Sequence, residues 1–206
     1  MIMKKLFSTI ASVALLGLSM TTAGAAESLK PDAEGYIRDW IMLAPIPLPG
    51  EASCAESLLK EQVKDEAALK PKAGDKTKID GKELTWKNIT AATNHFDFNA
   101  ILKTDNDHAA GFMVTYLECE KEMPDVIVAV ASNDQGRIYF NGVDIYAVTE
   151  ARPLMIDQDK GRVTLKKGVN VIVFKVLNEQ NSWQGAMRFL DKAGDPVKGL
   201  KIKLSP

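Results

Sequence analysis

Short strand patterns separated by turn signals run through most of the chain. The clearest one reads Arg137-Ile138-Tyr139-Phe140, then Asn141-Gly142, then Val143-Asp144-Ile145-Tyr146. Asn-Gly readily takes the two positive φ angles of a two-residue turn, so this stretch predicts a tight β-hairpin. A second hairpin is expected where residues 162–165 and 169–177 flank a turn at Lys167-Gly168.

Counting all such segments gives about nine or ten short strands, with turn signals roughly every 8–12 residues. The segment 125–131 is almost wholly apolar, which is typical of a strand buried on both faces. This spacing predicts an all-β, antiparallel sandwich in a single domain, because alternating βα units would need helices between the strands. The expected strands are 36–43, 83–87, 111–117, 125–131, 137–140, 143–146, 162–165, 169–177, 183–190 and 199–204.

One short helix is expected near the N-terminus, over about 54–69. Ser53 followed by Glu56 is a capping-box pattern, and Pro71 ends the helical stretch. The intervening acids and lysines predict a solvent-exposed face. Apolar side chains recur on the other face at fourfold spacing, at Leu59, Val63 and Ala67.

The first 25 residues have the pattern of an export signal. Lys4 and Lys5 precede an uncharged apolar stretch over 6–20, and Ala23-Gly24-Ala25 supplies small residues for cleavage. A membrane anchor is the alternative, but this stretch is shorter than the roughly 20 residues that span a bilayer. We therefore expect a secreted or periplasmic domain over 26–206, with no membrane span after removal of the signal. Cleavage after Ala25 leaves 206 − 25 = 181 residues and 24 basic against 27 acidic side chains, a net charge of −3.

Charge and motifs exclude several classes of function. The whole chain has 26 basic and 27 acidic side chains that are interleaved, so no basic surface for nucleic acid is expected. The two histidines, His95 and His108, lack zinc-site spacing, and no Gly-x-Ser-x-Gly or glycine-rich phosphate motif occurs. Among 27 acids, the sequence singles out no pair of glycosidase carboxylates. We therefore expect a protein without catalytic activity.

The two cysteines, Cys54 and Cys119, follow the signal and would meet an oxidising compartment. Two thiols in such a compartment often pair, and a disulfide here would close a long loop. Two buried, reduced thiols that pack as small apolar side chains are the alternative. The sequence leaves both open.

Four stretches of the chain carry a family resemblance. They are 131–142, which ends in Asn141-Gly142; 165–176, which contains Leu165-Lys166-Lys167-Gly168-Val169-Asn170; Asn178 with Trp183; and 188–191 with Gly194. In this order they resemble the galactose-binding-like jelly-roll family, the sandwich modules of secreted carbohydrate-active bacterial proteins. The likeness covers most of residues 26–206 and is weakest over 75–110. The turn Asn133-Asp134-Gln135-Gly136 departs from the family, which has two consecutive aspartates followed by glycine.

The resemblance implies a jelly-roll sandwich that binds carbohydrate. Trp183 would stack on a sugar ring, and Arg188 and Asn178 would hydrogen-bond the hydroxyls. The alternative is that Trp183 lies in the core and Arg188 points between strands to a carboxylate. Trp40 and Trp86 lie in apolar strand patterns, so the alternative for them is also burial in the core.

Jelly rolls often hold one structural calcium ion, which takes oxygen ligands from aspartates and backbone carbonyls. The candidate ligands are Asp157 and Asp159, and a second pair is Asp105 with Asp107. Aspartates at this spacing also commonly cap turns, which is the alternative interpretation.

The sequence thus favours a secreted, non-catalytic binding module whose partner is a polysaccharide or glycan. The alternative is a structural or interaction module that binds an envelope protein and has no sugar site. A hydrolase with an unrecognised carboxylate pair is the third reading. Exposure separates the first two: a stacking site needs at least one accessible tryptophan beside Arg188 or Asn178, whereas the interaction module buries all three tryptophans.

Overall fold

The structure, a computed structural model, describes residues 28–50 and 52–206. The expected export signal lies outside these residues. Strands predominate, with two short α-helices and one 3₁₀ turn. The strands are β1 (Asp39–Pro47), β2 (Lys76–Ile79), β3 (Lys82–Thr85), β4 (Lys87–Thr90), β5 (Phe96–Asp97), β6 (Ala109–Cys119), β7 (Met123–Asn133), β8 (Gln135–Phe140), β9 (Val143–Val148), β10 (Asp159–Leu165), β11 (Gly168–Asn178), β12 (Gln184–Leu190) and β13 (Lys201–Lys203). The helices are α1 (Cys54–Leu59), η1 (Glu66–Ala68) and α2 (Phe98–Leu102).

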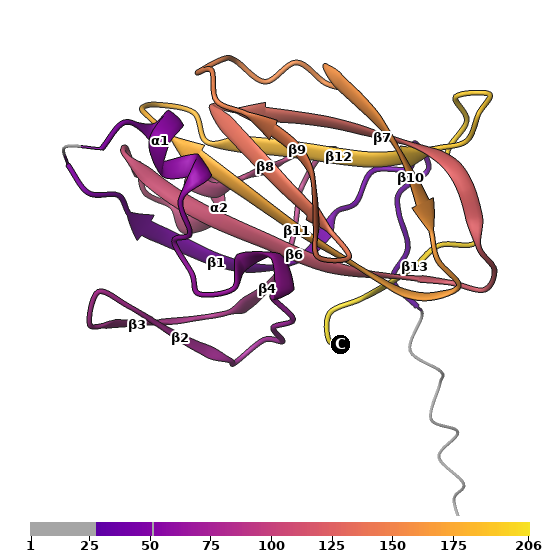
Figure 1. Ribbon diagram of the computed structural model, residues 1–206, viewed down its shortest axis with the longest axis horizontal. Helices are drawn as coiled ribbons and strands as arrows, with labels where there is room; N and C mark the ends of the chain where they lie inside the picture. Colours follow the sequence, from indigo (N-terminus) through magenta and orange to yellow (C-terminus); the bar gives the residue numbers. More distant parts are fainter. Residues whose placement is uncertain (1–27, 51) are drawn as a thin grey trace, which may run out of the picture.

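Two antiparallel sheets lie face to face (Figure 1). The larger has seven strands in the order β4-β1-β6-β11-β8-β9, with β13 paired to β6 beside β1. The smaller has four strands in the order β10-β7-β12-β5, and β2 and β3 form a separate two-stranded hairpin. The expected all-β architecture of antiparallel sheets is thereby confirmed.

Apolar side chains from the facing sides of the two sheets form the main core. On β11, Ile172, Phe174 and Val176 point inward, while β7 contributes Val126, Val128 and Val130. This alternation follows from the two-residue period of a strand. A layer of aromatic rings closes the core toward β5, where Phe96 packs edge-on against Trp40, Phe98 and Phe174.

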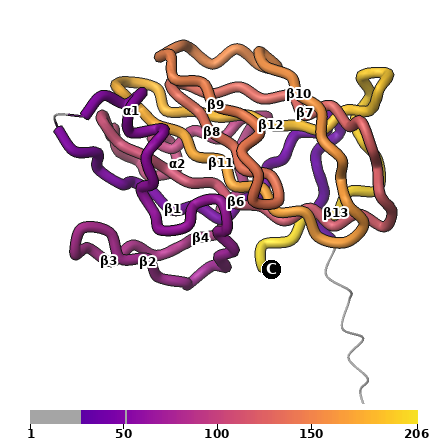
Figure 2. Tube along the Cα trace, in the orientation of Figure 1, coloured from indigo at the N-terminus to yellow at the C-terminus, as the bar shows by residue number. Residues whose placement is uncertain are grey.

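The opposite face of the large sheet is also apolar and lies beneath a third layer. Segment 48–86, which contains α1, η1 and the β2–β3 hairpin, covers it; we call this segment the cap (Figure 2). Leu58 and Trp86 of the cap pack against Phe112 and Tyr116 of β6. Both faces of the central part of the large sheet are therefore buried, which explains the nearly continuous burial along β6 and β11.

The helix expected over about 54–69 is much shorter. Ser53 does cap it, since its Oγ accepts a hydrogen bond from Glu56 N at 3.2 Å. However, α1 ends at Leu59, whose side chain is 58% exposed, and only the short turn η1 follows at Glu66–Ala68. The chain turns inward after α1 because Glu66, expected on a solvated face, is fully buried against Lys175 of β11.

The two predicted hairpins have different outcomes. The Asn141-Gly142 hairpin is confirmed: both residues have positive φ, and Phe140 pairs with Val143 across the turn between β8 and β9. The hairpin at Lys167-Gly168 is wrong, because β10 pairs with β7 in the small sheet, whereas β11 pairs with β6 and β8 in the large one. That turn carries the chain from one sheet to the other.

The first strand also differs from its prediction. A strand is expected over 36–43, whereas β1 begins at Asp39 and continues through Pro45 to Pro47. The pairing of β1 with β6 shifts register between Leu43 and Ile46, and such an irregularity accommodates the missing amide donor of Pro45. Among residues 28–50 and 52–206, no helix is long and apolar enough to cross a membrane.

Candidate functional site

Trp183 lies in the core and offers no ring face to solvent. It is fully buried, stacks on Phe98 with ring centroids 4.1 Å apart, and donates its indole N–H to Val176 O at 3.1 Å. Trp40 is also fully buried, and Trp86 is 2% exposed. All three tryptophans therefore lie in the core, as the alternative to sugar stacking predicts. A stacking platform at Trp183 would require the core to open.

Arg188 points to a carboxylate, as the alternative to sugar binding predicts. Its guanidinium forms a two-pronged ion pair with Asp157 and lies over the Tyr36 ring, 4.8 Å from the centroid. The hydrogen bond to Asp157 raises the pKa of Arg188 above its ordinary value. This pair fastens the loop before β10 to β12. Arg188 is only five residues from Trp183 along the chain, but the two side chains have different neighbours: Arg188 contacts Asp157 and Tyr36, whereas Trp183 packs on Phe98.

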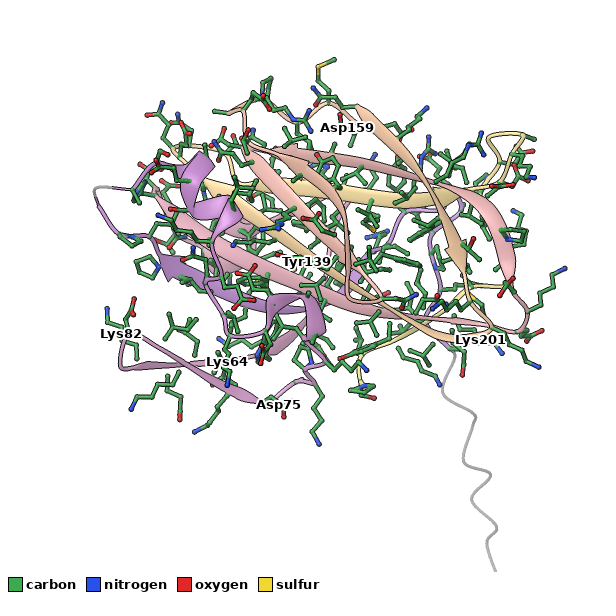
Figure 3. The ribbon with its side chains drawn as sticks, viewed as in Figure 1. Lys64, Asp75, Lys82, Tyr139, Asp159 and Lys201 are labelled. Atoms are coloured by element: carbon green, nitrogen blue, oxygen red, sulfur yellow. The ribbon has the colours of Figure 1, made fainter. Side chains whose placement is uncertain are left out.

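Asp157 and Asp159, the first pair of aspartates considered for calcium, do not fit an ion. Both carboxylate oxygens of Asp157 are held by Arg188, and those of Asp159, labelled at the top of Figure 3, are held by Arg152 and the Tyr146 hydroxyl. A cation at either place would replace an arginine that already neutralises the carboxylate. In the described part of the chain, no group of three or more His, Cys, Asp or Glu side chains is placed to hold a metal ion.

Cys54 and Cys119 are both buried and free, which is the reduced one of the two alternatives that the sequence leaves open. Cys54 Sγ lies 3.8 Å from Asn178 O, at the end of β11, whereas Cys119 pairs with Gly168 at its start. Eleven residues of extended strand separate these ends by roughly 30 Å. No disulfide can bridge that distance, since it requires Cα atoms within about 7 Å.

A polar pocket of about 600 Å³ lies where α2 meets the loops after it and after β11. We call it the end pocket. Asn181 and Ser182 lie in the chain between Asn178 and Trp183, two of the residues predicted to bind a ligand. All of its lining residues except Ala100 have polar or charged side chains: Asp97, Asn99, Lys103, Thr104, Asp105, Asp107, Asn181 and Ser182.

Hydrogen bonds fix the walls of the end pocket. Asp97 caps α2 by accepting from Ala100 N at 2.9 Å, and Asn99 Nδ2 donates to Asn181 O at 2.7 Å. Asp107 Oδ1 accepts from Asn181 N at 2.9 Å. The two loops and the helix are therefore tied to one another, and the side chains of Asp97, Asn99 and Asp107 are held in place.

Asn178 supports the end pocket from behind. Its side chain is fully buried, and its Nδ2 donates to Asn106 O at 2.7 Å, within the loop that carries Asp105 and Asp107. Its Oδ1 accepts no hydrogen bond from the residues that the structure describes. Of the three predicted ligand-binding residues, Asn178 and Trp183 thus lie under this pocket, and Arg188 does not belong to it.

Sequence reasoning missed the end pocket because three separate segments form it. The sequence indicates Asp105 and Asp107 as ion ligands or as turn caps, and it predicts no helix over 98–102. The signal for α2 was present: Asp97 precedes the helical residues 98–102 and is a favourable N-cap residue. Nothing local, however, indicates that α2 meets the loop after β11.

Comparison of the chain with protein-family models, with curated proteins and with solved structures found no match in any of the three.

Proposed function

We propose that this chain is a secreted or periplasmic, non-catalytic module of the galactose-binding-like jelly-roll type that binds carbohydrate in the end pocket. The observation that carries the proposal is a hollow lined mainly by carboxylate, amide and hydroxyl side chains, in which Asn99 and Asp107 are hydrogen-bonded to the backbone of Asn181. Such groups match the hydroxyls of a glycan, and a fixed site loses little conformational entropy on binding.

Binding in this pocket would rely on hydrogen bonds and not on aromatic stacking. Trp183, the expected stacking residue, instead packs under the pocket on Phe98, the first residue of α2. Its part would be to hold α2 and the 179–182 loop in position. Each hydrogen bond to a solvated sugar hydroxyl contributes modestly, so we expect weak affinity for a single sugar unit.

Affinity electrophoresis tests the proposal. The protein is run through native gels that contain a panel of polysaccharides, with calcium and then with a chelator. We expect at least one polysaccharide to retard it, Asp105→Ala with Ser182→Ala to abolish the retardation, and the chelator to have no effect. Glu122→Ala, an exposed acid at the opposite end of β6, is the matched control and should run like the unmodified protein.

A second candidate is the structural or interaction module, whose criterion of three buried tryptophans is met. A further observation favours it: Met155 and Ile156 are adjacent, 60% and 40% exposed, on a loop held by the Arg152–Asp159 and Arg188–Asp157 ion pairs. We rank it second because two side chains supply only a small part of the roughly 800 Å² that each partner of a stable interface buries. Absence of retardation in every gel would overturn the carbohydrate proposal and favour this one.

A further inference from the structure

The cap leaves one end of the large sheet partly bare. On the face of β11 that the cap covers, Val173, Lys175 and Leu177 are buried. Val171 on the same face is only half-buried, and Val169, two residues closer to the start of the strand, is 42% exposed. An apolar strand face therefore extends from beneath the cap into solvent.

A groove of about 350 Å³ lies at this bare end, and we call it the cap groove. Residues 67–70 of the cap form one side, and the Asn141-Gly142 turn and the start of β11 form the other. Ala67, Leu69 and Val171 line the groove and also pack against the apolar cluster beneath the cap. The groove thus opens onto the edge of a core that the cap covers incompletely.

Two lysines line the cap groove, one from each side. Lys70 follows η1 in the cap, and Lys166 precedes β11. Both are exposed, and neither forms an ion pair with any residue that the structure describes, unlike Lys201 and Lys203 of β13. Among the described residues, the lining of the groove therefore carries two positive charges and no negative one.

The carboxylates on neighbouring elements do not compensate these two charges. Asp65 is exposed two residues before Ala67, but it does not line the groove. Three others are already held in ion pairs: Glu66 of η1, Asp144 of β9, and Glu118, which pairs across the strands with Val169. A ligand that covers the apolar side chains would therefore meet two free ammonium groups.

Two kinds of occupant fit this surface poorly. A second copy of the chain, docked groove to groove about a two-fold axis, would bring four lysines together. A free small molecule would stay largely in solvent, because Val169 and both lysines are themselves exposed, whereas small-molecule sites enclose most of their ligand. A protein segment needs to bury only one anchoring side chain here, since the rest of the partner can contact the molecule elsewhere.

We propose that the cap groove docks a segment of a partner protein in which one apolar side chain is flanked by acidic residues. The apolar side chain would cover Val169 and Val171 and so extend the layer that the cap begins. The carboxylates would pair with Lys70 and Lys166, and such rim charges select the partner and speed association. The end pocket lies beyond Asn178, at the other end of β11, so this inference is independent of carbohydrate binding.

Designed peptides test the inference. Binding of short labelled peptides to the protein is measured by fluorescence polarisation at low salt. Each peptide has leucine, isoleucine, valine or phenylalanine at its centre and glutamate on both sides. One control has lysine in place of glutamate, and the other has serine at the centre. We expect at least one acidic peptide to bind roughly tenfold more tightly than both of its controls, and salt to weaken its preference over the lysine control.

Charge reversal locates the site. Lys70→Glu with Lys166→Glu should abolish binding of the acidic peptides and favour the lysine peptides instead. Lys82→Glu with Lys160→Glu makes the same change at two exposed positions outside the groove, on the β2–β3 hairpin, where Lys82 is labelled in Figure 3, and on β10. This control should bind like the unmodified protein. Val169→Ser should weaken binding of the acidic peptides without changing its dependence on salt.

Equal binding of the acidic peptides and their controls would overturn the proposal, as would a preference that persists in the groove variant or is lost in the control variant. Cosedimentation with vesicles of anionic phospholipid that the groove variant abolishes, without peptide binding, would also overturn it and assign the groove to a membrane. In the polysaccharide gels, the groove variant should run like the unmodified protein. Loss of retardation there would assign the glycan to the cap groove and overturn the inference.

Discussion

Cys54 lies beside a histidine, as a nucleophilic thiol does, but burial keeps the Cys54 thiol protonated. His108 Nε2 lies 2.9 Å from Pro49 O, which can only accept, so this nitrogen carries the hydrogen. His108 Nδ1 then faces Cys54 Sγ at 3.6 Å as an acceptor, a pairing that elsewhere activates thiols. Here burial raises the pKa of Cys54 to about 11, and the nearby carboxylates of Glu179 and Asp134 add to the shift.

Thiol titration tests this assignment. Below pH 9 the folded protein should react slowly at both Cys54 and Cys119, because both are buried and burial raises the pKa of each. Unfolding in urea without reductant should release two reactive thiols per chain. Rapid reaction of the native protein at Cys54 would contradict the buried, protonated thiol, and no reactive thiol after unfolding would reveal a disulfide.

The same shift gives a pH dependence of stability. Between the ordinary thiol pKa and about 11, the unfolded chain loses the Cys54 proton while the folded chain keeps it. The folded state therefore binds more protons, and this contribution to stability falls as the pH rises through that window. Urea unfolding at pH 8 and pH 10 should show a smaller loss of stability on alkalinisation in Cys54→Ala than in the unmodified protein.

At the scale of elements, close packing between strands depends on glycine at one position of β12. Gly185 lies opposite Phe96 of β5, and a Cβ added there would lie 2.3 Å from the Phe96 ring. The ring cannot simply move away, because it packs edge-on against Trp40, Phe98 and Phe174. The short pairing of β5 with β12 therefore requires a residue without a side chain.

We expect Gly185→Ala to lower the free energy of unfolding by about 1–3 kcal/mol, the usual cost of overpacking a core. Gly161→Ala on β10 of the same sheet is the matched control, since an added Cβ would meet only Val128 Cγ1 at an ordinary 3.5 Å. That control should stay within about 0.5 kcal/mol of the unmodified protein. Urea unfolding of the three proteins decides the matter, and equal stability of the two variants would refute the packing argument.

At the scale of the whole molecule, a buried ion pair joins the cap to the large sheet. Lys175 Nζ lies 2.9 Å from Glu66 Oε1, both side chains are fully buried, and the ammonium also donates to Lys60 O at 2.6 Å. Burial lowers the pKa of Lys175, because it disfavours the charged form. Tyr139, labelled near the centre of Figure 3, donates to Glu66 Oε2 at 3.3 Å. The pair thus sets the position of the cap on an otherwise apolar face.

Removing either partner should leave an uncompensated buried charge. We expect Lys175→Met or Glu66→Gln to cost about 3–5 kcal/mol in unfolding free energy, and Lys175→Met with Glu66→Leu to recover most of that loss. The exposed pair Lys76–Glu83, with side chains 61% and 56% accessible, is the control. Its Lys76→Met variant should cost less than about 1 kcal/mol. A double variant as unstable as the single variants would show that the ion pair itself contributes the free energy of unfolding, and that an unpaired buried charge is not the cause of the loss.

The sequence by itself determined the features that neighbouring residues control. The Asn141-Gly142 turn forms as predicted because positive φ angles are a local property, and Ser53 caps α1 through an amide three residues away. Alternation of apolar residues placed most strands correctly and predicted antiparallel sheets, because side chains on a strand point alternately to two faces.

Only the tertiary structure decided everything that depends on residues far apart in the chain. Helix α1 ends early because Glu66 pairs with Lys175, which is 109 residues away in the chain. Arg188 pairs with Asp157 in the loop before another strand. Cys54 and Cys119 lie at opposite ends of β11 and are too far apart to form a disulfide. Trp183 is buried because α2 packs over it. The end pocket joins three segments in the same way. Local patterns specify how each segment folds, whereas burial and pairing depend on which distant segment the fold brings against it.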